Sequence, residues 1–493
     1  MADVTTFTER EQRFDRVRRA VGVWLGPVLF LAVLAAPTGL APLPHRLAAV
    51  MTLVVTWWIT EPVPLPVTAL LGPALAALLG VSRARDAFSP FGDPVIFVFL
   101  GSFLLAEALQ VHGLDRRIAL AVLGARGVAG SPARIRVAVA LVTAAISMWI
   151  SNTATAAMML PIALGLVRAL SAAGSRESPR SILLLVAIGA SLGGMATPVG
   201  TPPNLLALGF LEEAGHGLDF LRFMAIGVPL SLALTAMTLL IVRGVMPQAP
   251  GVPSEVGGWV KRERADQEPW RAGQWACAVA FATAVVLWLV PGVITLLGAA
   301  ADTRARVVAD RLEESVVALA AAGLLFLWPV GDRRALTWKE AVRVDWGTLL
   351  LFGGGLSLGK MLFDTGLAGV LGRGVIQATG VTSLWALTAL VLATTIVLTE
   401  LVSNVATISM LGPLVLALTR ELGVAPLPPL LAACFGASMG FMFPVGTPPN
   451  AIVYGTGLIP LTAMMRVGVV VDVLSFFVIF AGLRVLCPLL GLA

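Results

Sequence analysis

Long apolar runs alternate with short basic or Pro- and Gly-rich segments along the whole chain. The runs recur from Val21 to Leu486, and the longest suffice to cross the roughly 30 Å hydrocarbon core of a bilayer. This pattern predicts an all-α polytopic membrane protein, with the lipid bilayer as its solvent. The first run follows a charged arm (1–20) and lacks a small-residue cleavage site. We therefore expect residues 21–41 to remain as a first transmembrane helix rather than a cleaved signal peptide.

Two sequence motifs occur twice. The segments from Pro198 to Asn204 and from Pro444 to Asn450 both read PVGTPPN. The dipeptides at Ser151 and Ser403 both read Ser-Asn and lie 252 residues apart, the offset that also separates Asp93 from Asp345. Internal duplication is the simplest explanation. We place repeat 1 at 46–246 and repeat 2 at 274–493, joined by a charged, Pro- and Gly-rich linker at 247–273.

The PVGTPPN motif predicts a broken helix in each repeat, near 180–214 and near 427–458. Proline removes a backbone donor and glycine loosens the chain, so a helix cannot continue through this motif. Such irregular backbone is tolerated at membrane depth only where protein or a cavity supplies polar partners.

The Ser-Asn segments predict re-entrant hairpins near 134–170 and 382–420. The arm from Val137 to Ile150 has 14 residues, or about 21 Å of helix, which is too short to cross the bilayer. The second hairpin is less clear, because the run from Leu384 to Val402 is long enough to span alone. If both segments are re-entrant, each repeat has five spans, the second repeat is inverted, and the total is about 11 transmembrane helices.

Composition and charge narrow the class further. A content of 58% hydrophobic and 13% charged residues excludes a soluble globular domain. The net charge of +6 comes from short basic clusters between apolar runs, which predicts membrane topology rather than nucleic-acid binding. With the N-terminal arm in the cytoplasm, most basic residues and the linker fall inside, and the C-terminus falls outside the cell membrane.

Several other chemistries are not indicated. Cys277, Cys434 and Cys487 lie far apart in apolar runs and form no metal or disulfide spacing. No HExxH motif or Walker loop occurs, and we expect no enzyme activity.

Four charged residues lie in or near the apolar runs. Glu400 adjoins the second Ser-Asn tip, where it either lowers the cost of a nearby cation or is satisfied by neighbouring helix ends. For Lys360, Glu107 and Glu61, snorkelling or structural pairing is favoured over a proton or exchange pathway.

The duplicated motifs resemble a known family. The run from Ser147 to Pro161, SMWISNTATAAMMLP, resembles the first signature of the divalent anion/sodium symporter family, and Thr399-Glu400 followed by Ser403-Asn404 resembles the second. The likeness extends over nearly the whole chain. It implies a homodimeric transporter of dicarboxylates, tricarboxylates or sulfate, in which a transport domain moves like an elevator against a scaffold. Val405 stands where many members carry threonine, which leaves the substrate subtype open.

Carried over by position, the resemblance implies two sodium sites with the substrate between the tips. Oxygen atoms of hydroxyls, amides and freed carbonyls are suitable ligands for such a hard cation. The first sodium site would comprise Ser147, Ser151, Asn152 and Gly200. The second would comprise Thr399, Val402, Asn404 and Gly446. The residues around the substrate would be Asn152, Thr153, Thr201, Ser403, Asn404, Thr447 and Pro448.

Three functional hypotheses follow. The preferred one is sodium-coupled symport of a C4-dicarboxylate such as succinate, malate or fumarate, with sodium as the coupling ion. The second is an anion exchanger, or a sulfate, citrate or proton-linked transporter, of the same fold. The third, a channel or an intramembrane enzyme, is disfavoured. A channel needs no duplicated broken-helix site, and an enzyme needs a nucleophile or metal that the sequence does not offer.

Overall fold

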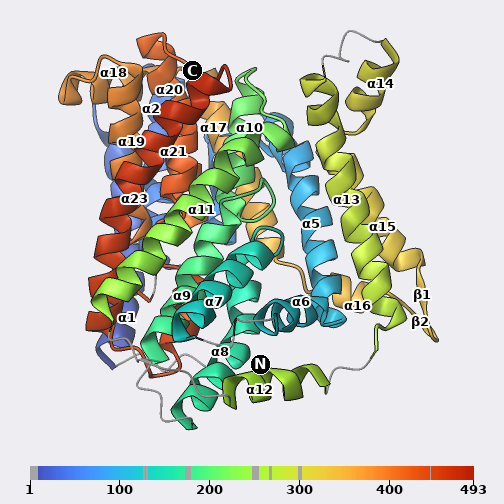
Figure 1. Ribbon diagram of the computed structural model, residues 1–493. Helices are drawn as coiled ribbons and strands as arrows, with labels where there is room; N and C mark the ends of the chain where they lie inside the picture. The colour runs from blue at the N-terminus through green and yellow to red at the C-terminus, as the bar shows by residue number, and fades with distance from the viewer. Residues whose placement is uncertain are drawn as a thin grey trace.

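The computed structural model is almost entirely helical (Figure 1). It describes residues 9–492 except 126–127, 129–130, 173–178, 247–254, 266–268, 298–302 and 445. Parts of the expected N-terminal arm (1–8) and linker (247–254 and 266–268) therefore lie outside the described residues. The predicted fold class, an all-α polytopic membrane protein, is confirmed.

The helices of the N-terminal half run in a simple order. They are α1 (Glu9–Ala35), α2 (Pro42–Thr60), α3 (Leu65–Leu78), α4 (Ala84–Phe88), the 3-10 helix η1 (Ser89–Gly92), α5 (Pro94–Val111), α6 (Leu114–Leu123), α7 (Pro132–Ser147), α8 (Asn152–Ala172), α9 (Pro179–Gly194), α10 (Pro202–Glu213) and α11 (Phe220–Val245). A further helix, α12 (Glu255–Ala265), precedes the second half.

The C-terminal half repeats much of this order. Its elements are α13 (Ala272–Leu296), α14 (Thr303–Arg311), α15 (Glu314–Leu327), β1 (Pro329–Val330), β2 (Arg333–Arg334), α16 (Trp338–Ala341), α17 (Trp346–Asp364), α18 (Leu367–Thr379), α19 (Leu384–Thr399), α20 (Asn404–Leu422), α21 (Leu427–Gly436), α22 (Pro448–Tyr454) and α23 (Leu461–Leu489). The two strands pair antiparallel in a short hairpin.

The duplicated aspartates are helix caps. The side chain of Asp93 accepts a hydrogen bond from the backbone N–H of Val95 at the start of α5. Asp345 accepts one from the N–H of Thr348 at the start of α17. Each carboxylate satisfies an N–H that has no partner within its helix. The two repeats therefore begin corresponding helices in the same way.

Eight helices of the described chain are long and apolar enough to cross a membrane. They belong to α1, α4–α5, α8, α11, α13, α17, α20 and α23, and the pair α18–α19, bent by 96°, is a ninth candidate. Four shorter apolar helices, α3, α9, α15 and α21, complete the apolar set. The predicted total of about 11 transmembrane helices differs from this number in what it counts. It counts α9–α10 and α21–α22 as broken spans, and it leaves out α8 and α20 as arms of re-entrant hairpins.

Both Ser-Asn segments form the tips of helical hairpins. The arm α7 ends at Ser147 and α8 begins at Asn152, while α19 ends at Thr399 and α20 begins at Asn404. The entering arms α7 and α19 each have 16 residues, or about 24 Å of helix, which is less than the bilayer core. The second arm is therefore as short as the first, and the structure favours re-entry over a span from Leu384 to Val402.

The two repeats are inverted with respect to each other. Helices α6 and α18 occupy equivalent places in the sequence, each directly after the aspartate-capped helix. In Figure 1, α6 lies at the lower end of the molecule beside α12, whereas α18 lies at the upper end, near the end of α23. Equivalent elements at opposite ends are the signature of an inverted repeat.

The repeats also interlock. Within each repeat the entering hairpin arm packs against the first half of the broken helix, α7 on α9 and α19 on α21. Across the repeats, α10 packs against α20, and α22 packs against α8. Each hairpin is thus supported by the broken helix of the other repeat.

Thiol labelling tests the inversion. Ala125, just after α6, and Gln377, in α18, are both exposed and lie 252 residues apart. We expect Ala125→Cys and Gln377→Cys to react with a membrane-impermeant reagent from opposite sides, with Gln377→Cys labelled in intact cells and Ala125→Cys only after permeabilisation. The measurement is gel detection of a biotinylated reagent.

The unmodified protein is the control, because its three cysteines are buried. Labelling of both variants from the same side would contradict the inverted arrangement.

Candidate functional site

The first tip contacts the first broken helix through side chains. The hydroxyl of Ser147 donates to Oδ1 of Asn152 at 2.8 Å, and Nδ2 of Asn152 donates to Oγ1 of Thr201 at 3.4 Å. Ser147 and Thr201 are buried and Asn152 is half-buried. Three of the residues predicted from the sequence therefore meet in one polar cluster.

The second tip repeats this arrangement. Oγ1 of Thr399 lies 2.9 Å from Oδ1 of Asn404 and 2.7 Å from the carbonyl oxygen of Ala437. The hydroxyl has one hydrogen, so it donates to one of these oxygens at a time. Thr399 and Asn404 each lie 252 residues after their counterparts at the first tip. A hydroxyl paired with an asparagine oxygen is thus common to both tips.

The last residue of each PVGTPPN motif holds the broken backbone together. Nδ2 of Asn204 donates to the carbonyl oxygens of Gly194 at 2.9 Å and Thr197 at 2.7 Å. Both hydrogens of the amide are used in this way, and the side chain is fully buried. The asparagine satisfies carbonyls that lost their helical partners at the break.

Asn450 does the same in repeat 2. Its Nδ2 donates to the carbonyl oxygens of Gly440 at 2.9 Å and Phe443 at 3.1 Å. Asn204 and Asn450 are not among the predicted site residues, although both lie in the repeated motif that predicted the site.

Two glycines of repeat 1 allow the close approach of tip and break. A Cβ at Gly194 would lie 2.2 Å from Oδ1 of Asn152. A Cβ at Gly200 would lie 2.5 Å from the carbonyl oxygen of Gly194 and 2.8 Å from that of Met148. Because the atoms around Gly200 belong to the backbone, no side chain fits at that position. Gly446, the counterpart of Gly200, is less crowded, with its nearest neighbour at 3.4 Å.

The remaining predicted residues surround these clusters. The hydroxyls of Ser151 and Ser403 accept hydrogen bonds from the backbone N–H of Ala154 and Ala406 at the starts of α8 and α20, each at 3.3 Å. Oγ1 of Thr447 accepts from the N–H of Asn450 at 3.4 Å. Val402 and Thr447 are buried, whereas Thr153 and Pro448 are exposed.

Packing across the repeats relates the two tips. Helix α8 begins at Asn152 and packs against α22, which begins at Pro448. Helix α20 begins at Asn404 and packs against α10, which begins at Pro202. Each tip therefore belongs to a cluster that includes residues of both repeats. The N-termini of α8, α10 and α20 also bring partial positive charge to this region.

Glu400 accepts hydrogen bonds from the backbone at the second break, which is one of the two roles predicted for it. Its Oε1 accepts hydrogen bonds from the N–H groups of Phe441 at 2.7 Å and Met442 at 3.0 Å. Its Oε2 has no hydrogen-bond partner. Only one of its two oxygens is therefore accounted for.

The other charged residues in or near the apolar runs take structural positions. Glu61 pairs with Arg18 at 3.3 Å, and Glu107 lies 4.0 Å from Arg343. Lys360 is exposed. None of these three is part of the tip clusters.

Two further polar residues were not predicted from the sequence. Thr197 is fully buried, and its hydroxyl donates to the carbonyl oxygen of Met148 at 2.5 Å. Asp472 is a buried acid in α23. The signal for Asp472 was present, because an acid inside the last apolar run marks a functional candidate.

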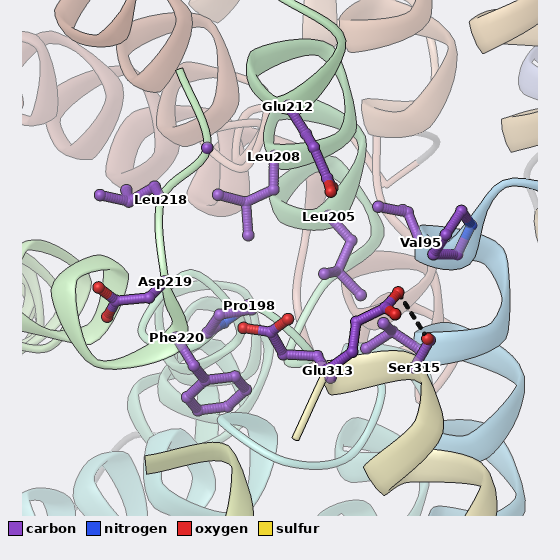
Figure 2. Close-up of a pocket in the computed structure, with 14 residues that line it drawn as sticks. Val95, Pro198, Leu205, Leu208, Glu212, Leu218, Asp219, Phe220, Glu313 and Ser315 are labelled. Carbon is purple, nitrogen blue, oxygen red and sulfur yellow. Dashed lines mark hydrogen bonds between the residues drawn. The ribbon is translucent and has the colours of Figure 1, made fainter. Parts of the chain in front are cut away.

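A cavity of about 220 Å³ lies beside the first break (Figure 2). Pro198, Leu205 and Phe220 line it together with four carboxylic acids, Glu212, Asp219, Glu313 and Glu314. Figure 2 shows the hydroxyl of Ser315 donating to Glu313, at 3.0 Å. None of the residues predicted to bind the substrate lines this cavity. Its acidic wall repels anions, so it does not suit a dianionic substrate.

Inverted repeats with broken helices and polar tips define a class, the secondary transporters. The fold is similar to that of the YdaH transporter of Alcanivorax borkumensis, whose crystal structure has an unusual topology. The TM-score is 0.51 at 16% identity, covering 90% of this chain and 98% of that one.

The model of the sodium:sulfate symporter transmembrane region matches residues 21–491, and the chain belongs to this family. It is similar to the sodium-dependent dicarboxylate transporter SdcS of Staphylococcus saprophyticus, with 31% identity over 97% of this chain and 93% of that protein. The SdcS protein of Staphylococcus aureus is 30% identical, over 95% of this chain and 91% of that protein. The resemblance seen in the sequence is confirmed, and the protein is a membrane transporter rather than an enzyme.

The hydrogen bonds from Asn204 and Asn450 to the broken backbone should contribute to the thermal stability of the protein. Asn204→Asp and Asn450→Asp replace two amide donors by carboxylate acceptors that face two carbonyls. Each unsatisfied buried carbonyl costs about 1–3 kcal/mol. We expect both variants to unfold several degrees below the unmodified protein in detergent, measured by thermal unfolding.

Gln377→Glu, the same chemical change at an exposed position, is the matched control and should leave the midpoint unchanged. Midpoints of the asparagine variants equal to that of the control would refute the bracing role.

Proposed function

We propose that this protein is a secondary active transporter that carries a small dianion into the cell together with sodium ions. The favoured substrate is a C4-dicarboxylate such as succinate, malate or fumarate. The observation that carries the proposal is the duplicated pairing of a hydroxyl with an asparagine oxygen at the two tips, 2.8 Å apart at the first and 2.9 Å at the second. The names of the SdcS relatives support both the substrate class and sodium dependence.

Each tip supplies the oxygen ligands that a sodium ion needs. The first site comprises Ser147, Ser151, Asn152 and Gly200, and the second comprises Thr399, Asn404, Gly446 and the carbonyl of Val402. Paired hydroxyl and amide oxygens next to irregular backbone are hard ligands already gathered in one place. Because Ser147 and Thr399 are fully buried, few waters can compete for the ion.

The dianion lies between the tips in this proposal. The residues around it are Asn152, Thr153, Thr201, Ser403, Asn404, Thr447 and Pro448. None of them is cationic, and a helix N-terminus offers only about half a charge. Two uncompensated negative charges at membrane depth are prohibitively costly. Sodium at both tips supplies the missing positive charge, so the ions and the dianion stabilise each other.

An elevator-type movement fits the packing. Helices α7–α10 and α19–α22 interlock across the repeats and form the proposed transport domain. Outside this group, α3 packs against α17 and α5 packs against α15, as in a scaffold. Two copies of the chain form a homodimer through this scaffold. The N-terminus and the linker lie in the cytoplasm, and the C-terminus lies outside the cell. Repeat 1 spans 46–246 and repeat 2 spans 274–493, joined by the linker at 247–273.

A related transporter of the same fold is the second candidate. The matching family model is named for sodium and sulfate, which keeps sulfate as an alternative substrate. Exchange instead of symport, or citrate as the substrate, differs from the main proposal in coupling or cargo but not in architecture.

Uptake into proteoliposomes tests the proposal. We expect labelled succinate to accumulate under an inward sodium gradient and not under potassium or proton gradients. The rate should rise sigmoidally with sodium, as at least two ions require. In equilibrium binding, saturating succinate should raise the apparent sodium affinity by the factor by which sodium raises succinate affinity, because coupling is reciprocal.

Labelled sulfate and citrate are the comparison substrates. If labelled succinate accumulates only when a dicarboxylate is present inside the proteoliposomes, and if succinate binding does not depend on sodium, the protein is an exchanger rather than a symporter.

The tip hydroxyls can be tested one at a time. Ser147→Ala and Thr399→Val each remove one proposed sodium ligand, and we expect each to raise the half-saturating sodium concentration roughly tenfold, which corresponds to about 1.4 kcal/mol. The measurement is the sodium dependence of succinate uptake.

The same two helices offer matched controls one turn earlier. The hydroxyls of Thr143 and Thr395 are buried like those at the tips but bond to the carbonyls of Val139 and Val391 in their own helices, both at 2.7 Å. Thr143→Val and Thr395→Val should keep the original sodium dependence. Equal effects in tip and control variants would remove the tips from the ion sites.

A further inference from the structure

Two buried acids lie behind the second break. Glu400 follows Thr399 at the end of α19, and Asp472 lies in α23. Each is 4% exposed. Oε2 of Glu400 and both carboxyl oxygens of Asp472 have no hydrogen-bond donor. Three buried carboxyl oxygens are therefore without partners in the described structure.

The two acids are neighbours. The carboxyl groups of Asp472 and Glu400 interact directly, and Asp472 also lies near the N–H of Phe441. One turn before Asp472, a Cβ at Gly468 would lie 2.4 Å from the carbonyl oxygen of Phe441. Helix α23 is thus pressed against the break, and this contact brings Asp472 to Glu400. Oε2 of Glu400 also borders Gly446, from whose Cβ position it is 3.7 Å away.

The pair lacks a cation. Within the described residues, none of the ion pairs includes Glu400 or Asp472. Two carboxylates out of water are unfavourable unless a proton or a metal cation lies between them. On the next turn of α23, Ser475 is fully buried and its hydroxyl also lacks a partner. Carboxylate and hydroxyl oxygens together are the ligand set of a hard cation.

The equivalent positions of repeat 1 hold no acids. Met148 stands 252 residues before Glu400. Ser231 lies four residues after Gly227, as Asp472 lies four after Gly468, and both glycines press against the backbone of their own break. The hydroxyl of Ser231 donates to the carbonyl oxygen of Leu192 at 2.7 Å. The corresponding position in repeat 1 is therefore neutral and satisfied, and the buried acids are particular to the second break.

We propose that Glu400 and Asp472 bind a sodium ion of their own, separate from the two ions at the tips. The proposal rests on sodium coupling as the protein's function, because that function supplies the cation. Since Glu400 adjoins Thr399 and holds the backbone of Phe441 and Met442, occupancy of this site stabilises the second break and the second tip beside it.

Equilibrium binding of radioactive sodium to the purified full-length protein tests the site without transport. We expect Asp472→Asn to bind about one sodium ion fewer per chain than the unmodified protein, and to lose part of its thermal stabilisation by sodium relative to choline. Glu400→Gln should have the same effect. It keeps an oxygen for the N–H groups of Phe441 and Met442, and it serves as the second variant if Asp472→Asn does not fold.

Asp115→Asn is the matched control, because Asp115 is also a buried aspartate, 5% exposed, in the distant helix α6. It should bind sodium like the unmodified protein. Equal sodium stoichiometry in Asp472→Asn and Asp115→Asn would overturn the proposal. A second outcome would also overturn the proposal. If the thermal stability of the unmodified protein depends on pH but not on sodium, and Asp472→Asn loses the pH dependence, the acid pair holds a proton rather than a sodium ion.

The double variant Ser147→Ala/Thr399→Val separates this proposal from the proposed function. It weakens both tip sites, so at a sodium concentration that just fills the unmodified protein it should hold about one ion, bound at the acid pair. If it binds as much sodium as the unmodified protein, the tip sites fail, while the comparison of Asp472→Asn with Asp115→Asn still decides the third site.

Discussion

A helix that breaks at membrane depth must find partners for its own backbone, because hydrocarbon offers none. The structure meets this constraint twice with the same device. Asn204 and Asn450 each turn both amide hydrogens onto two carbonyls of the interrupted helix. Without these bonds the break would leave buried carbonyls unsatisfied and would not keep one shape. The position of Thr201, three residues before Asn204, depends on these bonds, and so does its contact with Asn152 at the first tip.

The interlocked repeats extend this local constraint to the whole transport region. Helix α10 packs against α20, and α22 packs against α8, so neither hairpin has its full set of neighbours within its own repeat. A hairpin that enters only part of the bilayer needs such cover, because its tip carries polar side chains and helix N-termini. The cross-packing also ties both tips to one body. The proposed ion sites and substrate would therefore move together.

Much of the architecture could be predicted from the sequence, because its key motifs occur twice. Two copies of PVGTPPN and of Ser-Asn predicted the broken helices and hairpins, and the structure adds that α19 is as short as α7. The targets of Asn204 were not predictable, since they depend on how the loop between α9 and α10 folds back. Asp472 was missed for a geometric reason. It corresponds to Ser231 at an offset of 241 residues rather than 252, because the connections after the second hairpin are shorter. Likewise, Glu212 and Glu313 come from different repeats and meet only through the fold.

The two tips have nearly the same geometry but differ in the charge of the residues behind them. Both tips present a hydroxyl and an asparagine oxygen at nearly the same distance, so their geometry alone would not distinguish one ion from the other. Behind the first tip stand Met148 and Ser231, both neutral, and behind the second stand Glu400 and Asp472. On the proposed function, the second side attracts a cation before any dianion is present, because fixed negative charge is already there. The first side has no such charge, and its ion gains most once the dianion lies between the tips. The acids of repeat 2 would thereby give an order to binding events that the two-fold geometry leaves equivalent.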